Sequence, residues 1–368
     1  MSMDSTYKGK VLELKIYGQS HSPTIGVFIK GLSDGVRPDE DFTRSLMARR
    51  APGNNKWSTP RKEKDEVIFE QGEENTIHGY IVNTNTKPKD YASIMNKPRP
   101  GHADYTGKIK FKDEAAQSGG GIFSGRMTAP LCIAGSIALN ELNKRGIEIY
   151  AHLKRCGGID DDSCLMHEVN DEDFRRRLSE VKTKEFPVVS DEAGEQMKAK
   201  IEEARLSLDS VGAVVECVIY GLPAGLGGPI FDGLEGKIAS LIYAIPAVKG
   251  VEFGAGFDVA DMRGSRNNDE FRYEGDKVTL ATNNCGGILG GISVGEAAPL
   301  VFDCAFKPTP SIAREQNTID IMNKENTTIS IEGRHDPCVA PRAVPVVEAA
   351  AAIAIYDEIL AEEINEDA

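Results

Sequence analysis

The sequence predicts an α/β fold, and three observations lead to this prediction. Strand-like and helix-like segments alternate along the 368 residues. Glycine-rich loops separate these segments, and their short glycine clusters show neither a fixed repeat nor the composition of a linker. Hydrophobic residues make up 40% of the chain, which is enough for a large core. We therefore expect one large α/β domain over residues 1–368.

In the first half of the chain, side-chain patterns predict strands and helices in alternation. Residues 24–32 are rich in β-branched residues and end in glycine, as a strand does. Residues 39–50 begin with acids and end with two arginines, which suits the dipole of a helix. The remaining expected elements are a loop at 51–65, a strand pair at 65–72 and 76–84, a helix at 126–144 capped by Gly146, and a strand at 147–155.

The second half continues the alternation. An amphipathic helix is expected at 191–206, a strand at 211–223 and a helix at 236–245. Residues 343–363 are strongly apolar and predict a buried or interface helix. Three acids in this segment exclude a membrane span: Glu348, Asp357 and Glu358.

The net charge of −14 disfavours nucleic acid and anionic membranes as partners. Within this acidic chain, basic residues cluster between Arg44 and Lys64, with Glu63 as the one acid among them. Such a cluster indicates a local site for an anion, although a solvated charged loop would have the same composition.

The seven cysteines form no CxxC pair, and the first residues contain no apolar targeting segment. We expect reduced thiols and a cytoplasmic protein.

Five stretches combine glycine or proline with hydroxyl groups and basic or titratable residues: 18–22 (GQSHS), 97–107, 117–129, 307–312 and 332–345. In the third, glycines allow backbone N–H groups to approach an anion, and Arg126 lies where a helix is expected to begin. Together they predict an enzyme that binds an anion with several arginines and two loop histidines, His21 and His102.

Several site types fit poorly. Neither GxGxxG after a strand nor GxxxxGK[ST] occurs, and no two histidines lie within four residues of each other, so no metal is predicted. A Ser-His-Asp triad from Ser20 or Ser124 lacks the GxSxG turn but stays open, as does a phosphatase acting on a sugar phosphate.

In this order, the stretches resemble the chorismate synthase family. The opening GQSHS is similar to the family's usual Gly-Glu-Ser-His-Gly. The further matches are ARRAPG with TPRKEKDEV (48–67), RPGHADYTG (99–107), SGRMTA (124–129), GLPAGLG (221–227), AVKGVEFGAGF (247–257), RGSRNNDE (263–270), NNCGGILGGIS (283–293), KPTPSI (307–312) and GRHDPCVAPRAVPVVEA (333–349).

The resemblance implies anti-1,4-elimination of phosphate from 5-enolpyruvylshikimate 3-phosphate to give chorismate, the last common step of the shikimate pathway to aromatic amino acids. It implies reduced FMN as cofactor with no net redox change, and it associates NADP with the reaction. It also implies helices packed between antiparallel-rich sheets, a homotetramer, and the monofunctional type, which takes reduced flavin from an external reductant.

The resemblance assigns site residues as well. His21 is similar to the histidine that donates a proton to the departing phosphate, His102 to the one that supports the reduced flavin, and Asp336 to the acid that helps the flavin take the ring proton. The implied substrate-binding set is Arg50, Lys56, Arg61, Arg126 and Arg342. The implied flavin-binding set is Ile122, Phe123, Ser124, Ala247, Gly290, Lys307, Pro308, Thr309, Pro310, Ser311 and Arg334.

Two positions depart from the family pattern. Gln19 replaces the usual glutamate beside His21, which removes a negative charge there. Ile122 and Phe123 stand where many members have arginine and serine. These departures leave two rivals to an active enzyme: a family fold without activity, and a flavin-binding sensor or carrier without turnover.

Overall fold

The computed structural model describes residues 4–52, 57, 65–72, 75–83, 96–112, 118–331 and 336–366. Two five-stranded antiparallel sheets form its outer layers. The first has the order β1 (Ser5–Lys8), β2 (Glu13–Tyr17), β3 (Thr24–Lys30), β5 (Ile77–Val82) and β4 (Val67–Gln71). The second has the order β10 (Val248–Phe253), β15 (Leu300–Phe306), β8 (Ala213–Tyr220), β6 (Glu148–Cys156) and β7 (Ile159–Asp160).

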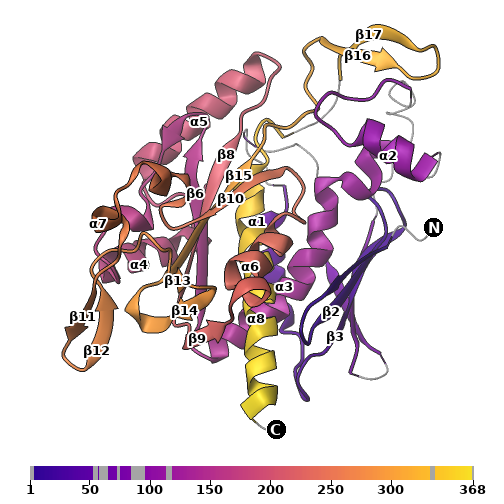
Figure 1. The fold of residues 1–368 in the computed structure, drawn as a ribbon. Helices are drawn as coiled ribbons and strands as arrows, with labels where there is room; N and C mark the ends of the chain where they lie inside the picture. Colours follow the sequence, from indigo (N-terminus) through magenta and orange to yellow (C-terminus); the bar gives the residue numbers. More distant parts are fainter. Residues whose placement is uncertain are drawn as a thin grey trace.

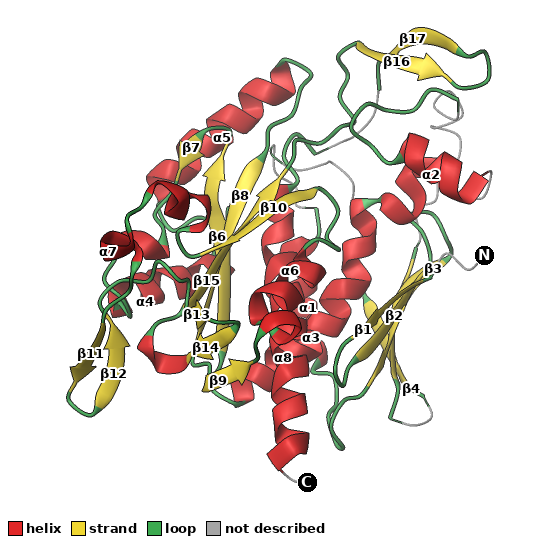
Figure 2. Cartoon of the chain, viewed as in Figure 1, coloured by secondary structure: helices red, strands yellow, loops and turns green. Residues whose placement is uncertain are grey.

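A layer of helices lies between the two sheets (Figures 1 and 2). Its members are α1 (Glu40–Arg50), α3 (Thr128–Lys144), α6 (Leu234–Ile242) and α8 (Ala340–Glu366). The α3 helix contacts β3 of the first sheet, and α8 contacts β6 and β8 of the second. The main hydrophobic core extends through both interfaces, from Leu12 to Leu360. The predicted sandwich of helices between antiparallel sheets is therefore confirmed.

Smaller elements surround this sandwich. Two helices, α4 (Glu172–Glu180) and α5 (Asp191–Leu206), lie beyond the second sheet, and α2 (Asp104–Phe111) lies near the top of the view in Figure 1. The others are α7 (Gly264–Asn267), the sheet of β9 (Ala224–Gly227), β13 (Ile288–Leu289) and β14 (Ile292–Val294), and the hairpins β11 (Phe271–Glu274) with β12 (Lys277–Leu280) and β16 (Gln316–Asp320) with β17 (Glu325–Ile329).

The predicted elements recur with small changes in their bounds. The helix at 191–206 has the predicted limits, because Ser190 caps it by accepting a hydrogen bond from the Ala193 N–H. The helix expected from Arg126 begins at Thr128 instead, since residues 125–127 form a 3₁₀ turn that Ser124 caps. The strand expected at 211–223 ends at Tyr220, before the turn at Gly221, whose φ is +76°. Most of the loop expected at 51–65 lies outside the described residues.

Helix α8 is tied to both sheets by its three buried acids. Glu348 accepts hydrogen bonds from Arg49 of α1 and, at 3.1 Å, from the Ala151 N–H of β6. Asp357 accepts from three backbone N–H groups of the β1–β2 turn, at 2.7–2.9 Å. Glu358 pairs with Lys10 and Lys237. Although α8 is long and apolar, no helix among the described residues could cross a lipid bilayer.

The crossing of α3 and α8 is unusually close at Gly135. A Cβ added there would lie 2.3 Å from the Cβ of Ala349. In contrast, a Cβ added at Gly236 of α6 would meet nothing within 4 Å. The backbones of α3 and α8 therefore approach as they do because residue 135 has no side chain.

These two glycines give a matched pair of stability predictions. Gly135→Ala is expected to lower the free energy of unfolding by about 1–3 kcal/mol, because the added methyl group overpacks the crossing. Gly236→Ala is expected to raise it by about 0.5–1 kcal/mol, because alanine has less backbone freedom to lose on folding. Urea unfolding followed by circular dichroism measures both values. A Gly135→Ala protein as stable as Gly236→Ala would contradict this account of the crossing.

Candidate active site

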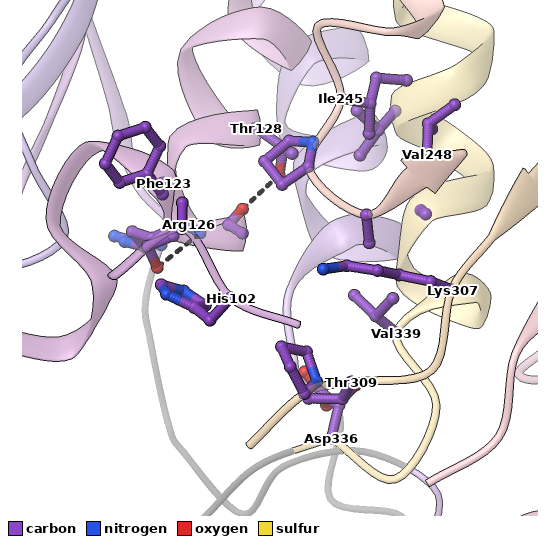
Figure 3. A pocket seen from close by; sticks show the side chains of 18 of the residues that line it. His102, Phe123, Arg126, Thr128, Ile245, Val248, Lys307, Thr309, Asp336 and Val339 are labelled. Atoms are coloured by element: carbon purple, nitrogen blue, oxygen red, sulfur yellow. Dashed lines mark hydrogen bonds between the residues drawn. The ribbon is translucent and has the colours of Figure 1, made fainter. Parts of the chain in front are cut away.

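A cavity of about 520 Å³ lies where the start of α8, the end of α1 and the start of α3 meet (Figure 3). Segments far apart in sequence supply its wall: Arg50, 99–103, 122–128, 243–249, 307–311 and 336–346. The cavity wall thus contains residues from four of the five stretches singled out in the sequence: 97–107, 117–129, 307–312 and 332–345. The fifth, residues 18–22, lies behind this wall.

The wall is strongly basic for a protein with a net charge of −14. Its basic side chains are Arg50, Arg99, Arg126, Lys249, Lys307 and Arg342. Among the described residues of the wall, Asp336 is the one carboxylate. Two further carboxylates, Asp65 and Asp104, contact these bases from outside the wall. The excess of positive charge suits a ligand with several negative charges.

One buried carboxylate holds two of the arginines. Arg50, which is 2% exposed, and Arg126 both donate hydrogen bonds to Asp65. Arg50 also donates to Thr128 at 3.3 Å, and Arg126 to Asn83 at 3.1 Å. Burial acts to raise the pKa of Asp65, but the charges of the two arginines outweigh it, so this pKa is lowered. Asp65 therefore stays ionised and fixes both guanidinium groups.

Asp336 and Arg342 form an ion pair at the start of α8. The Arg342 Nη1 donates to Asp336 Oδ2 at 2.7 Å, and its Nε donates to the backbone oxygen of Arg50 at 3.0 Å. Both side chains line the cavity. This pair joins the end of α1 to the start of α8 and places a carboxylate next to the arginine cluster.

Two lysines lie on the side of the wall made by the segments around β10 and β15. Lys307 points into the cavity in Figure 3 and donates to the backbone oxygen of Gly101. Burial lowers the pKa of Lys307, and the charge of neighbouring Lys249 lowers it further. An anion bound between these two amines would relieve this repulsion.

His102 and His21 reach this region in different ways. His102 lines the cavity and contacts Asp104 and Arg99. His21 lies in the β2–β3 loop, outside the wall, and both of its ring nitrogens are buried. The Ser20 N–H donates to the Gly121 oxygen at 3.2 Å, so the loop packs directly behind the residues that form the wall at 122–126.

The structure brings together most of the residues singled out in the sequence. The cavity wall includes His102, Asp336, Arg50, Arg126, Arg342, Ile122, Phe123, Ser124, Ala247, Lys307, Thr309, Pro310 and Ser311. Pro308 lies outside the wall, and so does Gly290, which is exposed in the β13–β14 hairpin. Lys56, Arg61 and Arg334 lie outside the described residues.

Four residues with direct contacts at the site were missed in the sequence: Asp65, Arg99, Asp104 and Lys249. Each lies inside a stretch already quoted for the family resemblance. The spacing of Arg99, His102 and Asp104 within one turn was a usable signal, because an acid and a base so near a histidine can orient its ring.

Comparison with known proteins gives consistent results. The family model described as "Chorismate synthase" matches residues 12–360. A chorismate synthase of Lancefieldella parvula is 39% identical over 97% of this chain and 96% of its own. A chorismate synthase of Thermococcus kodakarensis is 42% identical over 96% of this chain and 97% of its own. A solved structure titled "Crystal Structure of Chorismate Synthase" has a TM-score of 0.73 at 24% identity, over 96% of this chain and 93% of that chain.

The sandwich and its basic cavity suit an enzyme that acts on a small anionic molecule. Since the family model covers nearly the whole sequence and the relatives match at about 40% identity, the particular family follows. The chain belongs to the chorismate synthase family, whose members are phosphate-eliminating lyases.

Proposed function

We propose that this chain converts 5-enolpyruvylshikimate 3-phosphate to chorismate by anti-1,4-elimination of phosphate, as the last common step towards the aromatic amino acids. The observation that carries the proposal is the single cavity in which His102, Asp336 and the arginine cluster meet. The substrate has two carboxylates and a phosphate, and arginine forks bind such groups with paired hydrogen bonds.

The substrate-binding set comprises Arg50, Arg126 and Arg342, with Lys56 and Arg61 as predicted members outside the described residues. The first three are held rigidly by Asp65 and Asp336, so little side-chain freedom is lost when an anion binds. Their burial also strengthens each charge–charge contact, because the surrounding dielectric constant is low.

Three features of the cavity support FMN as the cofactor. The wall includes apolar groups that suit a flat ring system, among them Phe123, Ile245 and Val339 (Figure 3). Lys249 and Lys307 provide positive charge for a phosphate. The Thr309 hydroxyl is buried and has no hydrogen-bond partner among the described residues, so a bound ligand could supply one.

The residues proposed to hold FMN are Ile122, Phe123, Ser124, Ala247, Lys307, Thr309, Pro310 and Ser311. The roles of Gly290, Pro308 and Arg334 stay predictions. Ala247 has a φ of +79°, which is strained for a residue with a side chain, and such strain is typical of functional sites.

The elimination breaks the carbon–oxygen bond to phosphate and removes one ring proton. Reduced FMN, when bound, supplies electron density to this step without net oxidation or reduction. In the proposed mechanism, the arginines balance the charge that develops on the departing phosphate. That His21, which lies outside the cavity wall, gives this phosphate a proton stays a prediction. His102 carries the proton that supports the reduced flavin, and the Asp336 carboxylate helps in removal of the ring proton.

Further parts of the proposal concern the whole molecule. The main hydrophobic core, which runs from Leu12 to Leu360, supports one catalytic domain over residues 1–368. Two apolar side chains of one turn, Ile230 and Phe231, are 85% and 96% exposed and suit contacts in a homotetramer. An external source of reduced flavin, the association with NADP and a cytoplasmic location stay predictions.

One anaerobic assay tests the proposed function. The protein is mixed with chemically reduced FMN and 5-enolpyruvylshikimate 3-phosphate, and chorismate absorbance and free phosphate are followed together. Equimolar chorismate and phosphate are expected. Phosphate without chorismate would indicate a phosphatase instead. Bound FMN with neither product would indicate a flavin carrier or a family fold without activity.

A further inference from the structure

Asp104 makes the closest described contact to His102. Its Oδ1 lies 2.6 Å from His102 Nδ1. Arg99 donates three hydrogen bonds to the same carboxylate. Its Nε lies 2.6 Å from Oδ2 and its Nη2 lies 2.7 Å from Oδ1. Its backbone N–H donates to Oδ2 at 3.0 Å. Arg99 thus fixes the Asp104 carboxylate while this carboxylate contacts the ring of His102.

The local sequence produces this arrangement. Pro100 and Gly101 form a tight turn, in which the His102 N–H donates to the Arg99 oxygen and Gly101 has a φ of +72°. Asp104 then begins α2. Arg99 is buried, and its Nη1 donates to Ser311 at 3.0 Å. Because Ser311 belongs to the cavity wall, the turn cannot rotate independently of the site.

The contact fixes where the ring carries its hydrogen. A carboxylate only accepts hydrogen bonds, so the Asp104 oxygen 2.6 Å from Nδ1 favours a hydrogen on that nitrogen of His102. Arg99 Nη2, which only donates, lies 3.1 Å from Nδ1 and 3.3 Å from Nε2, and it can donate to Nε2 in the same tautomer. The other ring nitrogen, Nε2, then exchanges a proton with its surroundings. Gly120 leaves room in front of it, since a Cβ added at residue 120 would lie 3.3 Å from Nε2.

We propose that Asp104, held by Arg99, is a positioning residue for the reaction: it fixes the tautomer and orientation of His102 so that Nε2 is the nitrogen that exchanges a proton in the cavity. This inference rests on the proposed function. The arrangement follows the general logic of an acid that orients a catalytic histidine and stabilises its charged form.

The charges around His102 are consistent with this role. Asp104 places a negative charge next to the ring, and Arg99 on the same turn and Lys307, which donates to the Gly101 oxygen, place positive charges near it. Further charged groups of the wall are Asp336 just before α8, Arg342 in α8, and Arg126 in the turn before α3. Burial acts to raise the pKa of Asp104, but hydrogen bonds and charges from Arg99 and His102 outweigh it and lower this pKa strongly. Asp104 therefore remains ionised.

Asp104→Asn tests the proposal, because asparagine keeps the shape and removes the charge. In the anaerobic assay, kcat is expected to fall by roughly 10- to 10³-fold with KM changed less than about threefold, since only the proton-carrying group is disturbed. In a His102→Ala background, the same substitution is expected to change kcat by less than about twofold. If Asp104→Asn lowered kcat by the same factor with and without His102, the two residues would act independently and the proposal would be overturned. A wild-type kcat in Asp104→Asn would overturn it as well.

A second pair elsewhere in the chain provides a matched control. His167 Nε2 lies 2.7 Å from Asp162, and Arg177 binds the same carboxylate at 2.8 Å, all outside the cavity wall. Asp162→Asn removes an equivalent charge and is expected to keep the wild-type kcat. If wild type and Asp162→Asn make chorismate, the proposed function holds, and the result for Asp104→Asn bears on the positioning role alone.

A measurement on the wild-type protein covers the case in which Asp104→Asn fails to fold. Histidine labelled with ¹⁵N gives distinct NMR shifts for the two neutral tautomers, and the signal missing from His102→Ala identifies residue 102. We expect the neutral ring to carry its hydrogen on Nδ1. A neutral ring with its hydrogen on Nε2 would overturn the proposal without any change to Asp104.

Discussion

Replacing His102 by alanine is expected to lower kcat for chorismate formation by roughly 10²- to 10⁴-fold, the range for a lost proton-transfer group. Among the described residues, His102 is the one histidine in the cavity wall, which it shares with Asp336 and the arginine cluster. Because the arginines that hold the substrate remain, KM is expected to change much less than kcat. Single-turnover kinetics with reduced FMN, followed by chorismate absorbance, measures the effect.

His167→Ala is the control for this prediction. His167 also contacts an aspartate, and it stacks on Phe174 at 4.6 Å between ring centroids, but it lies outside the cavity wall. Its loss removes a similar ring and is expected to leave kcat within about twofold of wild type. Equal losses in the two variants would mean that the His102 effect arises from packing and not from proton transfer.

Replacing Asp357 by alanine is expected to lower the free energy of unfolding by roughly 3–5 kcal/mol. Asp357 is 2% exposed and accepts hydrogen bonds from the backbone N–H groups of Lys10, Val11 and Leu12. Alanine leaves the buried Leu12 N–H and the half-buried N–H groups of Lys10 and Val11 without their acceptor, and a buried donor that loses its partner costs about 1–3 kcal/mol. Chemical unfolding at a fixed protein concentration measures the loss.

Asp171→Ala gives the comparison at a site of the same kind near the surface. The Asp171 carboxylate also accepts two backbone N–H groups, at 2.8 and 2.9 Å, at the start of α4. Water can replace it there, so the expected loss is about 1 kcal/mol, as for an ordinary helix cap. Similar losses in both variants would show that water reaches the β1–β2 turn as easily as the start of α4.

Local signals in the sequence were enough to predict most of the elements. The helix at 191–206 has a capping serine before it and acids in its first turn, and these act within a few residues. The strand at 24–30 and the tail helix were equally clear from their apolar residues. The sheet order β10-β15-β8-β6-β7 could not be predicted in this way, because it pairs strands from distant parts of the chain.

The candidate site was predictable to a similar degree. Resemblance singled out His102, Asp336 and the arginines, and the fold brings them to one cavity. Nothing in the sequence could indicate that Asp65 bridges Arg50 and Arg126, because that contact depends on how the loop after α1 returns to the start of α3. The sequence also could not indicate that Gly290 is exposed outside the cavity wall, because a glycine-rich turn does not reveal whether it faces the site or the solvent.

The position of α8 in the chain has a consequence for biosynthesis. Both sheets precede it, and the inner face of the second sheet is covered by its apolar surface and by Glu348, while Asp357 and Glu358 tie it to the β1–β2 turn and to α6. While the ribosome is still adding this helix, the nascent chain exposes the hydrophobic inner face of the second sheet and the side of α3 that packs on α8. Chaperones therefore have their longest opportunity to bind this protein just before translation of α8 ends, and the sandwich can close only after that moment.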